Sequence, residues 1–294
     1  MMEIEKKRAS SWFRQLRNEI ISKFEALEHG ESDDKHSNVG KVKFETRKTH
    51  RPSRDNADLG GGEMAIMRDG HLFEKVGVNI STVYGELSET AVKVMTETKR
   101  LPNLKSNPYF WASGISVVAH MKSPFLPAIH MNTRMFWTED AWWFGGGIDL
   151  NPCIDDPEDT KKFHAALKET CDFHDSKFYP DYKMWADKYF YIPHRKRTRG
   201  VGGIFFDEHN TGDWENDFSF TQDVGRTFIP AFSDIIIQKK NLKWGPNEKE
   251  KQLLHRGLYA EYNLIYDRGT KFGLATGHDP DAVLMSLPPH AIWL

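Results

Sequence analysis

Cysteine is scarce in this chain, which has 294 residues and only two thiols, Cys153 and Cys171. Two cysteines exclude a framework of several disulfides, and so low a count is typical of a protein from a reducing compartment. Long apolar runs are also missing, and none approaches the roughly 20 residues that a membrane-spanning helix needs. Residues 1–28 lack the apolar segment of a signal peptide and contain several glutamates. We therefore expect a cytoplasmic protein without an integral membrane segment.

The chain also lacks a large excess of positive or negative side chains. The chain has 40 lysines and arginines against 42 aspartates and glutamates. This balance gives no electrostatic basis for nucleic acid or an anionic membrane as the main partner. We expect no nucleic-acid partner.

Common catalytic motifs are missing too. No GxSxG sequence occurs, and neither cysteine has a basic neighbour that would activate its thiol. The run Gly60-Gly61-Gly62 is not followed by the GK[ST] sequence of a phosphate-binding loop. Nucleophilic catalysis and nucleotide binding are therefore disfavoured.

Apolar periodicity predicts the secondary structure. Helical spacing covers residues 10–28, 89–101, 158–175, 177–191, 217–240 and 247–268, and a short helix opens at Asp279-Pro280 and runs to residue 287. β-Branched and aromatic runs predict strands at residues 42–46, 63–68, 71–80, 115–120, 129–137, 141–144 and 201–206. Because helices flank strands joined mainly by hairpins, we expect an α/β protein of the α+β type, with a large, mainly antiparallel sheet sandwiched between helices. Residues 1–294 show no domain boundary, and residues 1–9 precede the first helix and are expected to be disordered.

The strand predicted at residues 129–137 carries an unusual polar face. Side chains alternate across a strand, so His130, Asn132 and Arg134 share one face, while the opposite face is mostly apolar and suited to a core. If Glu139-Asp140 forms a two-residue loop, His130 lies opposite Asp149, Asn132 opposite Gly147 and Arg134 opposite Gly145. The glycines would leave room for a ligand beside the two polar side chains, or would serve only to bend the strand. The hairpin is therefore either a site or a bulged strand end.

Four histidines are candidates for metal binding, namely His120, His130, His164 and His194. No pair has the close spacing of a motif such as HExxH. A facial triad for non-haem iron needs two histidines and one carboxylate, which His120, His130 and Asp149 could supply. A metal-dependent oxygenase is therefore one alternative function.

Six blocks of sequence together resemble the oxygen-dependent coproporphyrinogen-III oxidases. They read SVVAH from Ser116, HMNTR from His130, WWFGGGIDL from Trp142, KMWADKYFYIPHR continuing through RGVGGIFFD from Lys183, EYNLIYDRGT from Glu261 and LMSLPP from Leu284. The resemblance implies a flat antiparallel sheet between helices and a homodimer. It also implies oxidative decarboxylation of the ring A and B propionates of coproporphyrinogen III to vinyl groups. That reaction gives protoporphyrinogen IX in haem biosynthesis and uses O₂ without an organic cofactor.

The same resemblance assigns residues. It makes His130 the proton donor, Asp149 the acceptor for the pyrrole NH groups, and Arg134 a third catalytic residue that also binds substrate. Ser116, Asn132 and Thr133 fall on substrate-binding positions. His120, His130, His164 and His194 remain candidates for a divalent metal, whose role stays open.

Three positions depart from the family pattern. Ala186 replaces a usual cysteine, Arg197 a usual glutamate, and His278-Asp279 a usual Gly-Arg. We expect backbone amides at Gly277, His278 and Asp279 to bind a propionate, with Asp279 capping the following helix. The alternatives to the oxidase are the metal-dependent oxygenase and a non-catalytic tetrapyrrole-binding protein.

Overall fold

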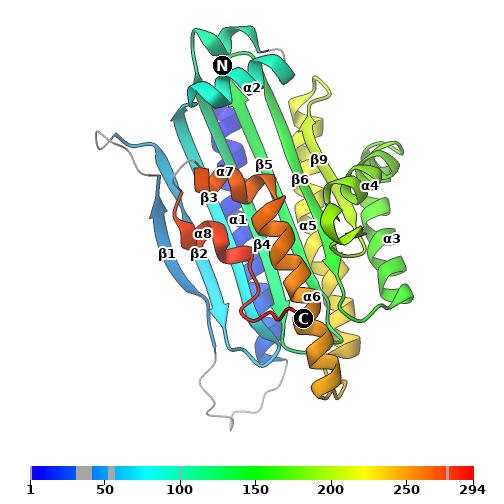
Figure 1. Cartoon of the computed structure of the whole chain (residues 1–294). Coiled ribbons are helices and arrows are strands. Elements are labelled where there is room, and N and C mark those ends of the chain that lie inside the picture. Colours follow the sequence, from blue (N-terminus) through cyan, green and yellow to red (C-terminus); the bar gives the residue numbers. More distant parts are fainter. Residues whose placement is uncertain (1, 31–41, 52–56, 100, 276–277) are drawn as a thin grey trace.

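The computed structural model describes residues 2–30, 42–51, 57–99, 101–275 and 278–294. Seven antiparallel strands form one sheet in the order β1-β2-β3-β4-β5-β6-β9. They are β1 (Glu45–His50), β2 (Gly60–Arg68), β3 (Phe73–Glu86), β4 (Tyr109–Met121), β5 (Ala128–Thr138), β6 (Trp142–Asn151) and β9 (Gly203–His209). Two short strands, β7 (Tyr191–Ile192) and β8 (Arg197–Thr198), pair separately. The expected α+β fold with one large antiparallel sheet in a single domain is confirmed (Figure 1).

Helices cover both faces of this sheet. They are α1 (Glu3–His29), α2 (Glu89–Lys99), α3 (Pro157–His174), α4 (Phe178–Tyr189), α5 (Trp214–Lys239), α6 (Pro246–Ile265), α7 (Arg268–Ala275) and α8 (Pro280–Val283). In Figure 1, α6, α7 and α8 lie in front of the sheet, whereas α1 and α5 lie behind it. None of the helices formed by the described residues has the length and apolar character needed to cross a membrane.

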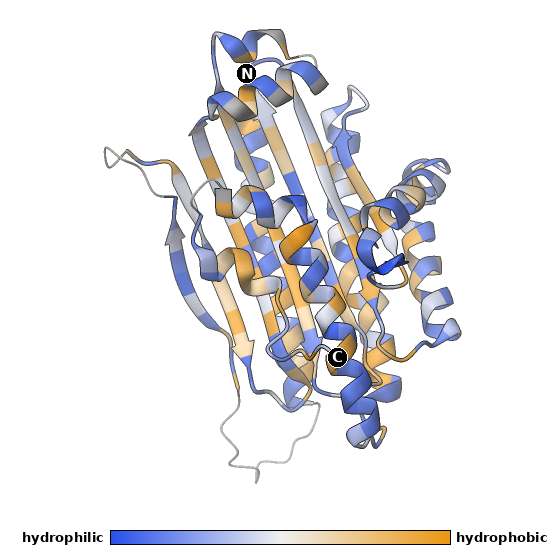
Figure 2. Ribbon diagram, in the orientation of Figure 1, coloured by the Kyte–Doolittle hydropathy of each residue, from blue (hydrophilic) through white to orange (hydrophobic). Residues whose placement is uncertain are grey.

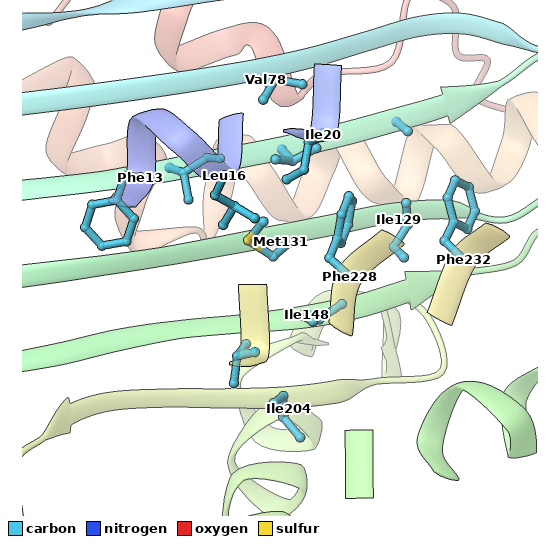
Figure 3. Close-up of a cluster of buried hydrophobic side chains, with 14 of the residues drawn as sticks. Phe13, Leu16, Ile20, Val78, Ile129, Met131, Ile148, Ile204, Phe228 and Phe232 are labelled. Carbon is cyan, nitrogen blue, oxygen red and sulfur yellow. The ribbon is translucent and has the colours of Figure 1, made fainter. Parts of the chain in front are cut away.

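The main core lies between the sheet and the helices behind it. Figure 3 shows Phe13, Leu16 and Ile20 of α1, with Phe228 and Phe232 of α5, among side chains of the strands. Met131 of β5 is fully buried in this cluster, as its place on the apolar face of the strand predicts. In Figure 2 orange residues lie on the central strands and in stripes on the helices, whereas β1 at the edge is mostly blue.

The hairpin of β5 and β6 has the predicted register. His130 pairs with Asp149, Asn132 with Gly147 and Arg134 with Gly145. The Thr138 amide donates to the Ala141 carbonyl at 2.8 Å, which closes a two-residue loop at Glu139-Asp140. The polar row on β5 therefore faces α6, α7 and α8, away from the main core.

Helices α1 and α6 begin or end at residues other than those expected from the sequence. In place of the disorder expected for residues 1–9, residues 3–9 form the first turns of α1, because Ala9 is fully buried and Lys6 lies 3.5 Å above the ring of Trp137. The helix expected to reach residue 268 ends at Ile265. The side chain of Asp267 accepts a hydrogen bond from the Thr270 amide at 2.6 Å, which starts a separate helix, α7.

The triple glycine lies inside β2. A Cβ added at Gly61 would come within 2.1 Å of the Thr49 carbonyl oxygen, and one at Gly62 within 2.1 Å of the Ile80 carbonyl oxygen. These glycines therefore allow close strand pairing, in agreement with the expectation that they form no phosphate loop.

Candidate active site

A cavity of about 530 Å³ lies between the polar row of β5 and the layer of α6, α7 and α8. Ser116, His130, Asn132 and Arg134 line it, so the structure brings together the main residues predicted from the sequence. A groove of about 610 Å³ between α3 and α5 is lined by side chains such as Lys162 and Glu169 and contains none of the predicted site residues. The cavity beside β5 is therefore the candidate active site.

His130 and Asp149 form a hydrogen-bonded pair at the base of this cavity. The Nδ1 of His130 lies 2.6 Å from Oδ1 of Asp149. Because an ionised carboxylate only accepts hydrogen bonds, Nδ1 carries the proton. This leaves Nε2 as the nitrogen that faces the cavity, with the Asn132 amide nitrogen 3.5 Å away.

Asp149 itself is buried behind His130, with 1% of its surface exposed. Its second oxygen, Oδ2, accepts hydrogen bonds from Arg199 Nη2 at 2.6 Å and from Asn151 Nδ2 at 2.7 Å. Burial would raise the pKa of Asp149, but Arg199 and His130 outweigh burial and hold its pKa at about 2. Asp149 is therefore a hydrogen-bond partner of His130 in this structure, and its expected role as the acceptor for the pyrrole NH groups stays a prediction.

Arg199 was not predicted from the sequence, yet it lies at the centre of the site. Its guanidinium is fully buried and stacks within 4.4–4.7 Å of the rings of Phe190, Tyr259 and Tyr262. Burial acts to lower the pKa of Arg199, whereas the opposing charge of Asp149 raises it. The charge therefore stays fixed and balances the Asp149 carboxylate.

Arg134 continues the row along β5. Its Nη1 donates to Asn132 Oδ1 at 3.2 Å, and its Nη2 donates to Asp207 Oδ1 at 2.8 Å. A Cβ at Gly145 would lie 2.9 Å from the Arg134 guanidinium carbon, so the glycine provides the room for this side chain. Asp207, on β9, is a second site residue that the sequence did not predict.

The metal candidates do not converge. His164 uses both ring nitrogens, with Nε2 3.0 Å from the Val201 carbonyl and Nδ1 3.1 Å from the Tyr179 hydroxyl. His194 likewise contacts Tyr266 and Glu261. Among the residues that the structure describes, no three histidine, cysteine, aspartate or glutamate side chains come together in a way that could hold a metal ion.

Comparison with known proteins agrees with this geometry. Residues 8–294 match the family described as Coproporphyrinogen III oxidase. The chain belongs to this family. A protein of Rickettsia bellii (strain OSU 85-389) named oxygen-dependent coproporphyrinogen-III oxidase is 48% identical over 284 residues, which cover 97% of this chain and 96% of the relative. A protein of the same name from Rickettsia rickettsii (strain Sheila Smith) is 47% identical over 289 residues, or 98% of each chain.

Two other residues that the motifs of the coproporphyrinogen III oxidase family single out occupy different surroundings. Ser116 lines the cavity and pairs with Asn132 across the strands. Thr133 borders the cavity but has no exposed surface, because its side chain alternates to the face that packs on the main core. The side chain of Ser116 therefore lies where it can contact a ligand, whereas that of Thr133 does not.

The loop with His278 and Asp279, which departs from the family pattern, caps a helix and forms an ion pair. Asp279 caps α8 by accepting from the amides of Asp281 and Ala282 at 3.0 and 3.4 Å, and it pairs with Arg47 Nη1 at 2.5 Å. The His278 amide donates to the Gly273 carbonyl at 3.0 Å. Of the three amides expected to hold a propionate, that of His278 is therefore engaged within the chain, Gly277 lies outside the described residues, and the role of the Asp279 amide stays a prediction. The expected cap at Asp279 is confirmed.

The other two departures from the family pattern lie away from the cavity. Ala186 is fully buried in a cluster with Phe190, Phe205 and Tyr262, where a small apolar side chain fits. Arg197 is exposed on β8. Neither change alters the candidate site directly.

Removing the charge of Asp149 should destabilise the fold. Asp149→Asn would leave the buried Arg199 guanidinium without its counter-charge, which costs about 3–5 kcal/mol in comparable sites. Denaturant unfolding should show this loss. The matched control is Glu215→Gln, which breaks an exposed ion pair with Arg8 and should cost less than about 1 kcal/mol. Equal stability of Asp149→Asn and the wild type would show that the pair carries no such constraint.

His120 should make stability depend on pH, with the loss beginning at a higher pH than that at which carboxylates titrate. Burial lowers the pKa of His120 from 6.5 to about 3. Between these values the unfolded chain binds a proton that the folded chain does not, so stability is complete above about pH 6.5 and falls as the pH decreases towards 3. Denaturant unfolding at pH 7.5 and pH 5 should show a loss of about 1–2 kcal/mol from this group.

His120→Gln should reduce that loss because glutamine does not titrate. The same change at His71, whose imidazole is exposed, is the control and should leave the pH dependence unchanged. A His120→Gln protein with the full wild-type dependence would disprove the assignment.

Proposed function

We propose that this chain catalyses the oxygen-dependent oxidative decarboxylation of the ring A and B propionates of coproporphyrinogen III to vinyl groups, which gives protoporphyrinogen IX in haem biosynthesis. The observation that carries the proposal is the row of His130, Asn132 and Arg134 along one cavity in a chain of the coproporphyrinogen III oxidase family. This row places a proton-exchanging group, an amide and a cation where one large ligand would contact all three.

The charges of the cavity suit a ligand with several carboxylates. Arg51, Arg134 and Arg268 line it from three different segments. The Arg51 guanidinium donates to the Tyr84 carbonyl at 2.7 Å and lies 5.0 Å from the ring of Phe110, and within the described residues it is paired with no carboxylate. A half-buried arginine in this state favours a carboxylate ligand, because guanidinium and carboxylate groups pair by two parallel hydrogen bonds.

The reaction balances without a bound organic cofactor. Each propionate loses CO₂, one proton and two electrons to become a vinyl group. O₂ accepts the two electrons and, with two protons, becomes hydrogen peroxide. The protein therefore has to bind the tetrapyrrole, exclude water and move protons, which is work that positioned side chains can do. His130 Nε2 is the atom that we assign to proton exchange, while Asp149 holds Nδ1.

Turnover assays test this proposal directly. Purified protein with coproporphyrinogen III should release CO₂ in air and none without O₂, and exhaustive chelation should leave the rate unchanged. Loss of activity on chelation, restored by one transition metal, would favour the metal-dependent oxygenase. Binding of the tetrapyrrole with no CO₂ release would favour a non-catalytic binding protein.

A pair of histidine variants provides the control for the same assay. His130→Gln should lower kcat by roughly 10²–10⁴-fold, the usual effect of removing a general acid or base. His164→Gln, whose imidazole contacts Val201 and Tyr179 away from the cavity, should retain most activity. An active His130→Gln enzyme would contradict the assignment of His130.

We also propose that the protein acts in the cytoplasm as a homodimer whose contact includes the end of α6. Tyr262 is buried within the chain, whereas Leu264 and Ile265 are about half exposed. Sedimentation at micromolar concentration should show a dimer, and Leu264→Asp should weaken it while an equivalent change at exposed Ile237 on α5 should not. A monomeric wild type would disprove the dimer.

A further inference from the structure

A second, very small chamber lies between the sheet and α6. It has a volume of about 20 Å³ and is bounded by His120 at the end of β4, Asn151 at the end of β6 and the residues of α6 that face the sheet. Four lining residues, His120, Asn151, Arg256 and Tyr259, each expose 4% or less of their surface to solvent. The chamber is therefore a small, largely buried space that is lined in part by polar side chains.

Five polar atoms of the lining residues are buried and have no hydrogen-bond partner among the described residues. They are His120 Nδ1, Asn151 Oδ1, His255 Nε2, Arg256 Nη1 and Tyr259 Oη. A buried polar atom without a partner is costly and needs an explanation. Five of them around one chamber indicate that a bound molecule supplies their hydrogen bonds.

The donors and acceptors can be assigned. His120 Nε2 lies 2.9 Å from the Ser286 carbonyl, so Nε2 carries the proton. Burial lowers the pKa of His120 to about 3, so the ring is neutral at pH 7 and its Nδ1 is an acceptor. Asn151 Nδ2 donates to Asp149, so its Oδ1 is also an acceptor.

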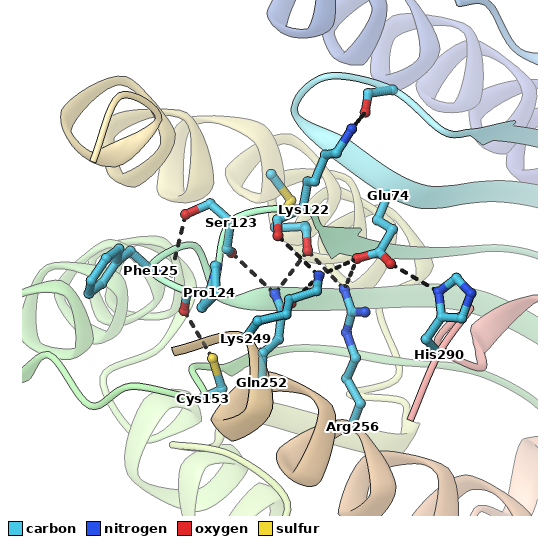
Figure 4. Close-up of polar contacts among 12 residues, drawn as sticks. Glu74, Lys122, Ser123, Pro124, Phe125, Cys153, Lys249, Gln252, Arg256 and His290 are labelled. Atoms are coloured by element: carbon cyan, nitrogen blue, oxygen red, sulfur yellow. Dashed lines mark hydrogen bonds and ion pairs between the residues drawn. The ribbon is translucent and has the colours of Figure 1, made fainter. Parts of the chain in front are cut away.

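Two lining groups donate. Arg256 uses Nη2 for Glu74 and the Met121 carbonyl, both at 2.8 Å, and its Nη1 remains (Figure 4). Burial raises the pKa of Tyr259 to about 12, so its hydroxyl keeps its proton. The chamber thus offers two acceptors, two donors and His255 Nε2, which can take either role in a neutral ring.

We propose that this chamber binds one water molecule that orients Asn151 and, through it, the Asp149–His130 pair. A water molecule donates two hydrogen bonds and accepts two, which matches the two assigned acceptors and the two assigned donors and leaves His255 Nε2 outside its four hydrogen bonds. An anion would be repelled by the lone pairs of His120 and Asn151, and a cation would be repelled by the positive charge of Arg256. A volume of about 20 Å³ also fits one water, which needs roughly 10–15 Å³ by this measure.

The water acts on the active site through the Asn151 amide. As long as Oδ1 accepts from the water, Nδ2 is directed at Asp149 Oδ2, and Asp149 Oδ1 remains available for His130 Nδ1. Loss of the water would leave Oδ1 without a hydrogen bond and would remove one of the two contacts that fix the amide. Asn151 and Tyr259 are therefore positioning residues, and their effect on catalysis rests on the proposed function.

A high-resolution crystal structure tests the occupant. One well-ordered water should lie within hydrogen-bond distance of Asn151 Oδ1 and His120 Nδ1, and crystals soaked in bromide should show no anomalous peak there. A bromide peak in the chamber, or a chamber without solvent density, would overturn the proposal. This test does not depend on enzyme activity.

Tyr259→Phe tests the positioning role, with Tyr262→Phe as its matched control. Both rings stack on Arg199, but the Tyr262 hydroxyl donates to the Tyr189 carbonyl outside the chamber. Tyr259→Phe should shift the NMR resonance of the His130 Nδ1 proton and lower kcat roughly five-fold, the effect of one hydrogen bond, at unchanged KM. Tyr262→Phe should leave that resonance in place.

Equal responses of the two variants would refute the positioning role. If the wild type releases no CO₂, the proposed function fails, but the water density and the resonance of His130 still decide this inference on their own.

Discussion

The carboxylate of Asp149 and the guanidinium of Arg199 meet in a place from which water is excluded. Separating either group from its partner would leave a buried charge, so the surrounding structure has to keep them together. The pair connects β6 to the segment that follows β8, and the rings of Tyr259 and Tyr262 tie α6 to it. The position of His130 depends on this arrangement, because Asp149 gives its other oxygen to the imidazole.

The two faces of the sheet are packed differently, and this difference explains why the site lies on one of them. The face behind the sheet is packed mainly with apolar side chains, many of them from α1 and α5. The opposite face meets α6 and α7, whose inward side chains include Asn263 and Arg268, and a cavity remains between them. Alternation along β5 then sends His130, Asn132 and Arg134 into the cavity and Met131 into the core.

The sequence predicts those parts of the site that are local. Loop length and alternation along one hairpin are sufficient to pair His130 with Asp149 and Arg134 with Gly145. Arg199 and Asp207 were missed because their partners, Asp149 and Arg134, are 50 and 73 residues away in the chain, and no periodic pattern records such a contact. The ion pair of Asp149 with Arg199 is likewise visible only in three dimensions, because the two residues lie on separate segments of the chain.

One part of the cavity wall carries Asp279, a carboxylate at a position where the family usually has an arginine. Asp279 caps α8 and forms an ion pair with Arg47. The positive charge of Arg47 therefore neutralises the negative charge of Asp279 in this part of the wall. The arginines that line the cavity are instead supplied by β5, by α7 and by the residue after β1, namely Arg134, Arg268 and Arg51. Arg134 and Arg268 share Asp207, at 2.8 and 3.7 Å, whereas Arg51 is stabilised by a carbonyl and an aromatic ring. A ligand carboxylate therefore gains most at Arg51, where it adds a counter-charge that none of the described residues supplies.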